Sequence, residues 1–302
     1  MSLTNKIDFA MVFTVKKANP NGDPLNGNRP RIDYDGYGEV SDVCLKRKLR
    51  NRLQDLGEAI FVQSDNNRRD DYRSLNARFE GNKEIKGEGD KEKKAKIACK
   101  TWFDVRAFGQ VFAFKAKNKK GKNSDSEEES GESDSVSIGV RGPVTIQSAV
   151  SVETVVISSL QITKSVNLET DKNDPAKRAP DTMGMKHRVD FGVYKTFGSI
   201  NYQLAEKTGF SDADADKLLD ALKTLFVNDA SAARPDGSME IVKVIWWKHN
   251  CKIGQYSSAT VHRSLKIDVS ENSILPKVTI EPLAGLKPEM YDGESLCEKK
   301  HE

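Results

Sequence analysis

The stretch Ile7-Asp-Phe-Ala-Met-Val-Phe-Thr-Val15 decides the fold of this chain. Its largest apolar side chains stand at every second position, with Ala10 and Val12 between them. Such alternation is typical of a β-strand, because successive side chains of a strand point to opposite faces of a sheet. We therefore expect residues 7–15 to form the first strand of a sheet, with one face deeply buried.

A turn-rich loop and an amphipathic helix follow this strand. Residues 19–28 (Asn-Pro-Asn-Gly-Asp-Pro-Leu-Asn-Gly-Asn) are of the types that favour positive φ and exposed backbone amides. Asp42 is a good N-cap for a helix over about residues 43–56. One stripe of this helix carries Leu45, Leu49, Leu53 and Leu56.

Two polar segments interrupt the apolar pattern. Residues 64–100 are lysine-rich with few apolar anchors, so we interpret them as an insertion that projects from the core. Residues 101–114 regain apolar side chains at roughly helical spacing, which favours a helix packed back on the sheet. Residues 117–135 change from lysine to serine and glutamate without a large apolar side chain, the composition of a disordered loop.

The second half of the chain is rich in strand patterns. Residues 137–166 are rich in Val, Ile and Thr, and residues 240–247 alternate like a strand. Residues 167–185 break the pattern, which suits a protruding hairpin or a long functional loop. Asp212 or Asp214 can cap a helix that ends near residue 226. The patterns together predict an α+β fold with one β-rich core, two helices and large excursions.

The composition gives little support to several classes of protein. The 302 residues carry a formal net charge of only +3, so any nucleic-acid site must come from local clustering. The four cysteines are scattered without a CxxC pair, which argues against a zinc site and a disulfide scaffold. No apolar stretch approaches the roughly 20 residues that span a bilayer, and the start lacks the features of a signal peptide. We expect a soluble, cytoplasmic protein.

The sequence does not match the residue spacing of the metal-binding and phosphate-binding motifs that we compared with it. In the loop of residues 19–28, Pro24 stands where a calcium-binding EF-hand needs glycine. Gly22 is followed at P-loop spacing by Gly27-Asn28-Arg29, without the required lysine. The four histidines show no metal-ligand spacing. We therefore expect no cofactor, no metal and no catalytic residue.

The predicted helix is unusually basic. Five cations lie within seven residues, against Asp42 as the one nearby acid: Lys46, Arg47, Lys48, Arg50 and Arg52. A face of this kind can follow several phosphates. A solvated helix surface is the plain alternative, but the neighbouring glycine-rich loop favours an anion-binding role.

Five motifs, in this order, resemble the backbone subunit of the subtype I-C CRISPR Cascade complex, a member of the RAMP superfamily. The resemblance covers nearly the whole chain. The motifs are residues 19–31, Val40-Ser-Asp-Val-Cys-Leu-Lys-Arg-Lys-Leu-Arg50, Trp102-Phe-Asp-Val-Arg-Ala-Phe-Gly109, Ile138-Gly-Val-Arg-Gly-Pro-Val-Thr-Ile-Gln-Ser148 and Arg188-Val-Asp-Phe-Gly-Val-Tyr194.

The resemblance implies a hand-like architecture. The palm would have a fold like the RNA-recognition motif (ferredoxin-like), with a finger insertion and a thumb β-hairpin. We assign the palm to residues 1–63, 137–161 and 189–302, the fingers to 64–136 and the thumb to 162–188.

The resemblance also implies a non-catalytic protein that coats CRISPR RNA (crRNA). Copies would stack along the guide in a helical filament, each thumb would kink the guide, and the bases between kinks would pair with target DNA. Other Cascade subunits would bind at the filament ends and along its length. The RNA-binding residues would be Asn21, Gly22, Arg29, Arg31, Lys46, Arg47, Lys48, Arg50, Arg106, Arg141, Gln147, Ser148, Lys186, His187 and Arg188, with Met183 and Met185 as the wedge at the kink.

Two other functions stay open at this point. The chain could be a metal-independent endoribonuclease that processes precursor crRNA, with His187 as general base. It could also be an interaction scaffold whose basic helix binds an acidic protein instead of RNA.

Overall fold

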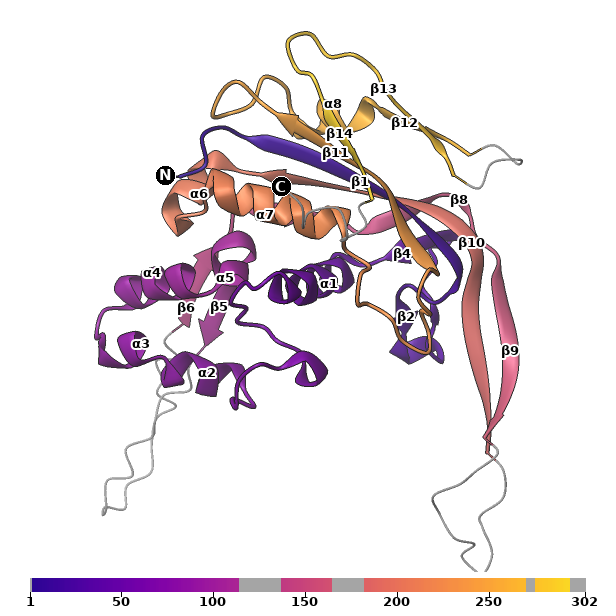
Figure 1. Cartoon of the computed structure of the whole chain (residues 1–302), viewed down its shortest axis with the longest axis horizontal. Coiled ribbons are helices and arrows are strands. Elements are labelled where there is room, and N and C mark those ends of the chain that lie inside the picture. Colours follow the sequence, from indigo (N-terminus) through magenta and orange to yellow (C-terminus); the bar gives the residue numbers. More distant parts are fainter. Residues whose placement is uncertain (1, 114–136, 165–181, 270–274, 294–302) are drawn as a thin grey trace, which may run out of the picture.

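The strand predicted first lies in the middle of one large antiparallel sheet (Figure 1). The computed structural model describes residues 2–113, 137–164, 182–269 and 275–293. The main path of the sheet has the order β14-β11-β1-β10-β8-β4, and β7 and β9 pair with β10 beside it. These strands are β1 (Ile7–Ala18), β4 (Tyr37–Val40), β7 (Val144–Ile146), β8 (Ala149–Thr154), β9 (Ile157–Lys164), β10 (Thr182–Ile200), β11 (Met239–Lys248) and β14 (Glu289–Asp292). The α+β class is confirmed.

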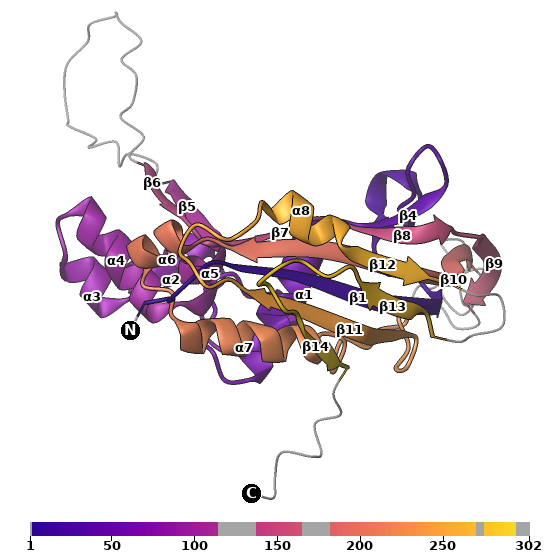
Figure 2. The same cartoon turned by 90° about the horizontal axis from the view of Figure 1, so that it is seen from above.

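β1 is buried on both faces, so the expectation of a single buried face is wrong. Phe9, Met11 and Phe13 belong to the larger core cluster, whereas Ala10 and Val12 belong to a second cluster. The second cluster is covered by α8 (Ser258–Arg263) and by the two-stranded sheet of β12 (Leu265–Asp268) and β13 (Lys277–Ile280) (Figure 2). The small Ala10 and Val12 side chains therefore face protein, not solvent.

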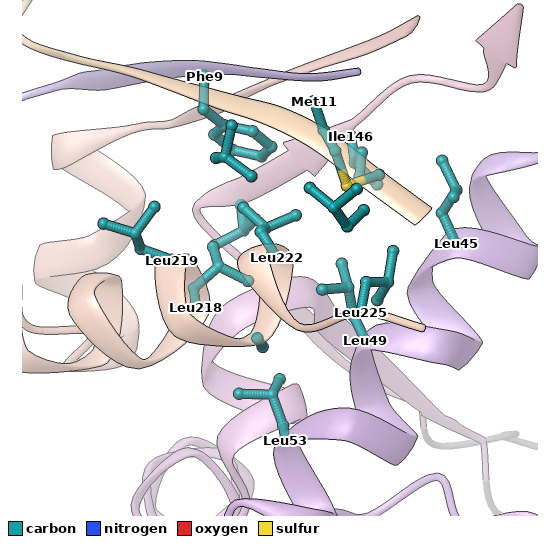
Figure 3. Packing of buried hydrophobic residues seen from close by; sticks show 14 of the residues in the cluster. Phe9, Met11, Leu45, Leu49, Leu53, Ile146, Leu218, Leu219, Leu222 and Leu225 are labelled. Atoms are coloured by element: carbon teal, nitrogen blue, oxygen red, sulfur yellow. The ribbon is translucent and has the colours of Figure 1, made fainter. Parts of the chain in front are cut away.

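Helices cover the other face of the sheet. α1 (Asp42–Asp55), α6 (Tyr202–Thr208) and α7 (Asp212–Lys223) form this layer (Figure 1). The predicted leucine stripe is buried at Leu45, Leu49 and Leu53, which pack with leucines of α7 and with Phe9 and Met11 (Figure 3). Leu56, at the C-cap, is 40% exposed.

Both helix caps lie one or more residues before their predicted positions. The N-cap of α1 is Ser41, whose hydroxyl accepts from the Cys44 amide, and Asp42 is the first helical residue. The N-cap of α7 is Ser211, which forms a capping box with Asp214. Serine and aspartate are both good caps, so sequence alone does not choose between neighbours.

A smaller lobe has its own core. It contains η2 (Asp65–Asn67), α2 (Leu75–Gly81), α3 (Lys83–Gly87), α4 (Lys91–Thr101), α5 (Phe103–Phe108), β5 (Gly109–Ala113) and β6 (Ser137–Arg141). Phe61, Phe79, Trp102 and Phe112 pack together there. The lobe therefore has more apolar anchors than its sequence indicated, and β6, assigned above to the palm, pairs with β5 of the lobe.

Residues 101–114 do not form one helix. α4 ends at Thr101, α5 begins at Phe103, and the chain turns into β5 at Gly109. Gly109 has φ +80°, and a Cβ there would lie 2.4 Å from the Val140 carbonyl oxygen. A glycine is needed at this turn, because a side chain would be both strained and obstructed.

β9 and the first half of β10 form a two-stranded ribbon, from Val189↔Ile157 to Thr182↔Lys164. The ribbon and the lobe lie at opposite ends of the sheet, with α1 between them (Figures 1 and 2). The predicted thumb, residues 162–188, includes the outer part of this ribbon and residues 165–181, which lie outside the described residues, as does the predicted loop 117–135. No helix among the described residues is long and apolar enough to span a membrane.

Candidate nucleic-acid interface

Three segments meet at the first turn of α1. Asn21 Oδ1 accepts from both the amide and the hydroxyl of Ser41 at 2.9 Å. Ser148 Oγ accepts from the Asp42 amide at 3.3 Å. We call Asn21, Ser41, Asp42 and Ser148 the helix-start site. The N-terminus of a helix carries partial positive charge, so this site favours anions.

The loop before the helix is a folded arm made of β2 (Gly22–Asp23), η1 (Pro24–Asn26) and β3 (Arg29–Pro30). Asn19 Nδ2 donates to the Asn28 carbonyl at 2.7 Å. A Cβ on Gly22 would lie 2.0 Å from Asn28 Oδ1, so this position requires glycine. Arg31 Nη2 pairs with Asp23 at 3.2 Å. The arm therefore has a defined shape in the free chain.

Eight of the predicted RNA-binding residues lie in the helix-start site, beside it in the chain, on the arm or in the first two turns of α1. Asn21 and Ser148 form it, Lys46 reaches it by pairing with Asp42 at 3.0 Å, and Gln147 precedes Ser148. Arg47 is exposed on α1. Gly22, Arg29 and Arg31 lie on the arm, where Arg29 is exposed.

The five cations of α1 do not form one exposed face. Lys48 is 4% exposed and pairs with Asp229. Burial lowers the pKa of its ammonium, and the charge of Asp229 opposes this shift without cancelling it. Arg52 is also buried, and its Nε donates to Thr224 Oγ1 at 2.8 Å. Both side chains point at the segment that follows α7, because their positions on the helix border the leucine stripe.

Arg50 and Arg106 are engaged inside the helical layer. Arg50 Nε pairs with Asp104 at 3.1 Å, and its guanidinium lies over the Phe108 ring. Arg106 Nη2 pairs with Asp214 at 2.7 Å and lies over the Phe103 ring. In this structure both arginines tie α5 to its neighbours, and they lie apart from the helix-start site.

The remaining predicted residues lie elsewhere. Arg141 is exposed at the end of β6, opposite Gly109. On the ribbon, Met183 and Met185 are 69% and 55% exposed. Lys186 Nζ donates to the Ala232 carbonyl at 2.7 Å. His187 is 9% exposed, with Nδ1 2.8 Å from Ser159 Oγ, and Arg188 is half-buried.

Some exposed apolar side chains were not singled out from the sequence. Leu25 and Tyr34 are almost fully exposed on and beside the arm, and Leu160 and Ile162 are exposed on β9. Leu160 pairs with Lys186 and Ile162 with Gly184, so they lie on the ribbon face opposite the two methionines. The turn Asp33-Tyr-Asp-Gly36 was the available signal, since an aromatic residue in a turn has no core to enter.

The described residues contain no group of three or more His, Cys, Asp and Glu side chains placed to hold a metal ion.

Comparison with known proteins places the chain in a family. A curated relative from Haloferax volcanii, "CRISPR-associated protein Cas7", is 28% identical over 222 residues, or 72% of this chain and 63% of its own length. The match thus spans less than two thirds of that relative. Two solved chains also align with 80% of this chain, each with a TM-score of 0.42. One, from a "CRISPR RNA-guided surveillance complex, pre-nicking", is 14% identical and covered over 78% of its own length. The other, from a "CRISPR RNA-guided surveillance complex", is 15% identical and covered over 69% of its length. The family model described as "CRISPR-associated protein Cas7" matches residues 5–282, and this chain therefore belongs to the Cas7 family.

Proposed function

We propose that this chain is the crRNA-coating backbone subunit of a subtype I-C Cascade complex. The observation that carries the proposal is the helix-start site, where Asn21 and Ser148 meet the N-terminus of a 14-residue helix that also carries the exposed Arg47. Membership of the Cas7 family supports it. Phosphate oxygens are the ligands that such an arrangement prefers.

The chemistry of the site suits a guide of any sequence. Arg29, Arg47 and the helix N-terminus recognise charge and leave base edges free. A coat of this kind lets the guide bases pair with target DNA, which carries the sequence recognition. The protein would then protect and order the guide without reading it.

The finer architecture is part of the same proposal. The large sheet with α1 and α7 corresponds to a palm similar to the RNA-recognition motif, the lobe to the fingers, and the ribbon to the thumb. Copies stack head to tail, each binding the next through two unlike surface patches. Such an assembly forms a helical filament and not a closed ring when each copy is also shifted along the axis. Met183 and Met185 act as the wedge at each kink, and other Cascade subunits complete the assembly in the cytoplasm.

We propose binding without catalysis. A general base must come within hydrogen-bond reach of the proton that it removes. The His187 ring is nearly buried and faces Ser159, which limits such access. Incubation of the pure protein with repeat RNA tests this part: cleavage that is lost in His187→Ala would establish the endoribonuclease instead.

Coexpression of the chain with a repeat-spacer transcript tests the binding function. We expect a large assembly that carries RNA and resists nuclease at regular intervals. The double variant Arg29→Ala/Arg47→Ala should lose most of the RNA at moderate salt. The matched control is Arg263→Ala/Lys266→Ala, which removes two exposed cations from the opposite face of the sheet. A protein that elutes without RNA in all three forms would refute the proposal.

A further inference from the structure

A polar pocket of about 200 Å³ lies near the C-terminal end of α1. Its wall combines Asn51 and Arg52 of α1, Asn66 and Asn67 of η2, and Asn228 of the turn after α7. At 1.5 Å per residue, Arg52 lies about 15 Å along the helix from Asp42. The pocket is therefore separate from the helix-start site.

Arg52 brings a buried charge to this pocket. Its side chain is 3% exposed, and Nε donates to Thr224 Oγ1 at 2.8 Å. Its Nη2 is buried and has no hydrogen-bond partner among the described residues. Buried charges in proteins are normally paired, because an unpaired ion loses its hydration without compensation. The guanidinium is thus short of one acceptor.

The carboxylates in the pocket wall are already paired with other cations. Asp55 pairs with Arg69 at 3.4 Å. Asp229 pairs with Lys48 and, at 3.0 Å, with Arg234. The negative end of the α1 dipole offers Arg52 partial compensation, but a dipole supplies no oxygen to the orphaned Nη2. The charge of Asp55 also acts on Arg52, but Arg52 is the cation of this wall that forms no ion pair among the described residues.

The missing partner should be an oxyanion. A guanidinium is a planar fork that matches the oxygens of phosphate or carboxylate. The asparagine side chains in the wall offer amide N–H donors to the remaining oxygens. The volume of about 200 Å³ is sufficient for a phosphate group. We propose that this pocket binds a phosphate group, with Arg52 as its charge partner.

A phosphate here would link three parts of the chain. α1 and the turn after α7 belong to the sheet-covering layer, whereas η2 opens the lobe. The bound anion would hold the base of the lobe against this layer. The inference does not depend on the proposed function, since it rests on the charge balance of the pocket.

Thermal unfolding of the full chain tests the inference, with inorganic phosphate as the probe. Phosphate at about a hundredfold excess over its Kd should raise the unfolding midpoint by about 4 °C above sodium chloride of equal ionic strength. Because phosphate also stabilises proteins nonspecifically, specific binding is judged from the difference in this rise between the wild type and the variants. Arg52→Met should lose the specific rise, and Arg263→Ala, which removes an exposed cation of α8 on the opposite face of the sheet, should keep it.

A second variant covers the case in which Arg52→Met does not fold. Asn228→Asp adds a negative charge to the wall without a change of shape, and aspartate tolerates the positive φ of +60° at this position. It should fold and lose the phosphate response. An equal rise in wild type, Arg52→Met and Asn228→Asp would overturn the inference, as would no rise in the wild type.

The source of the phosphate is assigned by repeating the titration on RNA-loaded protein. A lost response means that a phosphate of the RNA chain fills the pocket. A preserved response means that the pocket takes free phosphate or a small phosphate ester. Because the unloaded protein is measured separately, failure of RNA binding would leave the pocket test intact.

Discussion

Arg50 donates from Nε to the carboxylate of Asp104 at 3.1 Å, and this contact joins α1 to α5. The same carboxylate accepts the amides of Phe61 at 2.7 Å and Val62 at 3.0 Å. Asp104 is 1% exposed, and these three donors supply hydrogen bonds to its buried oxygens. The pair holds the sheet-covering layer and the start of the lobe together.

Arg50→Ala should therefore destabilise the free protein. Loss of a hydrogen bond to a buried charged group costs about 1.5–3 kcal/mol of the free energy of unfolding. Arg47→Ala, three residues away and exposed, should change it by less than about 0.5 kcal/mol. Urea denaturation of both variants measures the difference. Equal decreases in the free energy of unfolding would show that the contact with Asp104 does not stabilise the protein.

The same two variants should separate in RNA binding. Each phosphate contact of a single strand contributes about 0.7 to the slope of log affinity against log salt. Arg47→Ala should reduce the slope by about this amount, measured by fluorescence anisotropy with guide-length RNA. Arg50→Ala should leave the slope unchanged, because in the wild type the Arg50 guanidinium pairs with Asp104 and is not available to a phosphate. A reduced slope for Arg50→Ala alone would return Arg50 to the RNA interface.

Local pattern predicted the elements that depend on near neighbours. The alternation of residues 7–15 and the leucine spacing of α1 are both properties of short windows, and the corresponding elements are confirmed. The second buried face of β1 was missed because its cover, α8 and β12–β13, lies some 250 residues later in the chain. Ala10 and Val12 were the signal, since neither is polar.

Charge partners could not be predicted from the sequence. Lys48 pairs with a residue 181 positions away, Arg52 bonds one 172 away, and Arg50 pairs with one 54 away. A run of cations looks the same whether it faces solvent or a second layer of the protein. Lys48 precedes Leu49 and follows Leu45 by three positions, so it borders the apolar stripe, and that position was the available warning.

Gly198 of β10 should tolerate no side chain. A Cβ there would lie 2.1 Å from the Phe9 ring and 2.5 Å from the Thr145 carbonyl oxygen. Gly198→Ala should cost about 1–3 kcal/mol or more, because both a core ring and a backbone must move. Gly139→Ala in β6 is the control, since nothing lies within 4 Å of its Cβ position. Similar unfolding midpoints for the two variants would contradict the packing described for β10.

His262 should make stability depend on pH in one window. Burial lowers the pKa of the imidazole below its usual 6.5, and Lys6 acts in the same direction. The charge of Asp8, with Oδ1 3.9 Å from Nε2, and the hydrogen bond to the Gly198 carbonyl oppose this shift. Burial raises the pKa of the Asp8 carboxyl. Hydrogen bonds from His249 and Ser258, together with the charge and hydrogen bond of Lys6, outweigh burial, so the pKa is lowered and the carboxyl stays charged in this window.

As pH falls through about 6.5, the unfolded chain takes up a proton at His262 that the folded chain does not. The free energy of unfolding should therefore fall with pH, by at most 1.36 kcal/mol per pH unit from this group, until the folded pKa is reached. His262→Gln keeps an N–H donor for Gly198 and has no imidazole to titrate. Urea unfolding between pH 5 and 7.5 measures the free energy of unfolding of both proteins. The wild-type free energy minus that of His262→Gln should rise with pH. A flat difference would mean that folding does not shift the pKa of His262, and a falling difference would mean that folding raises it.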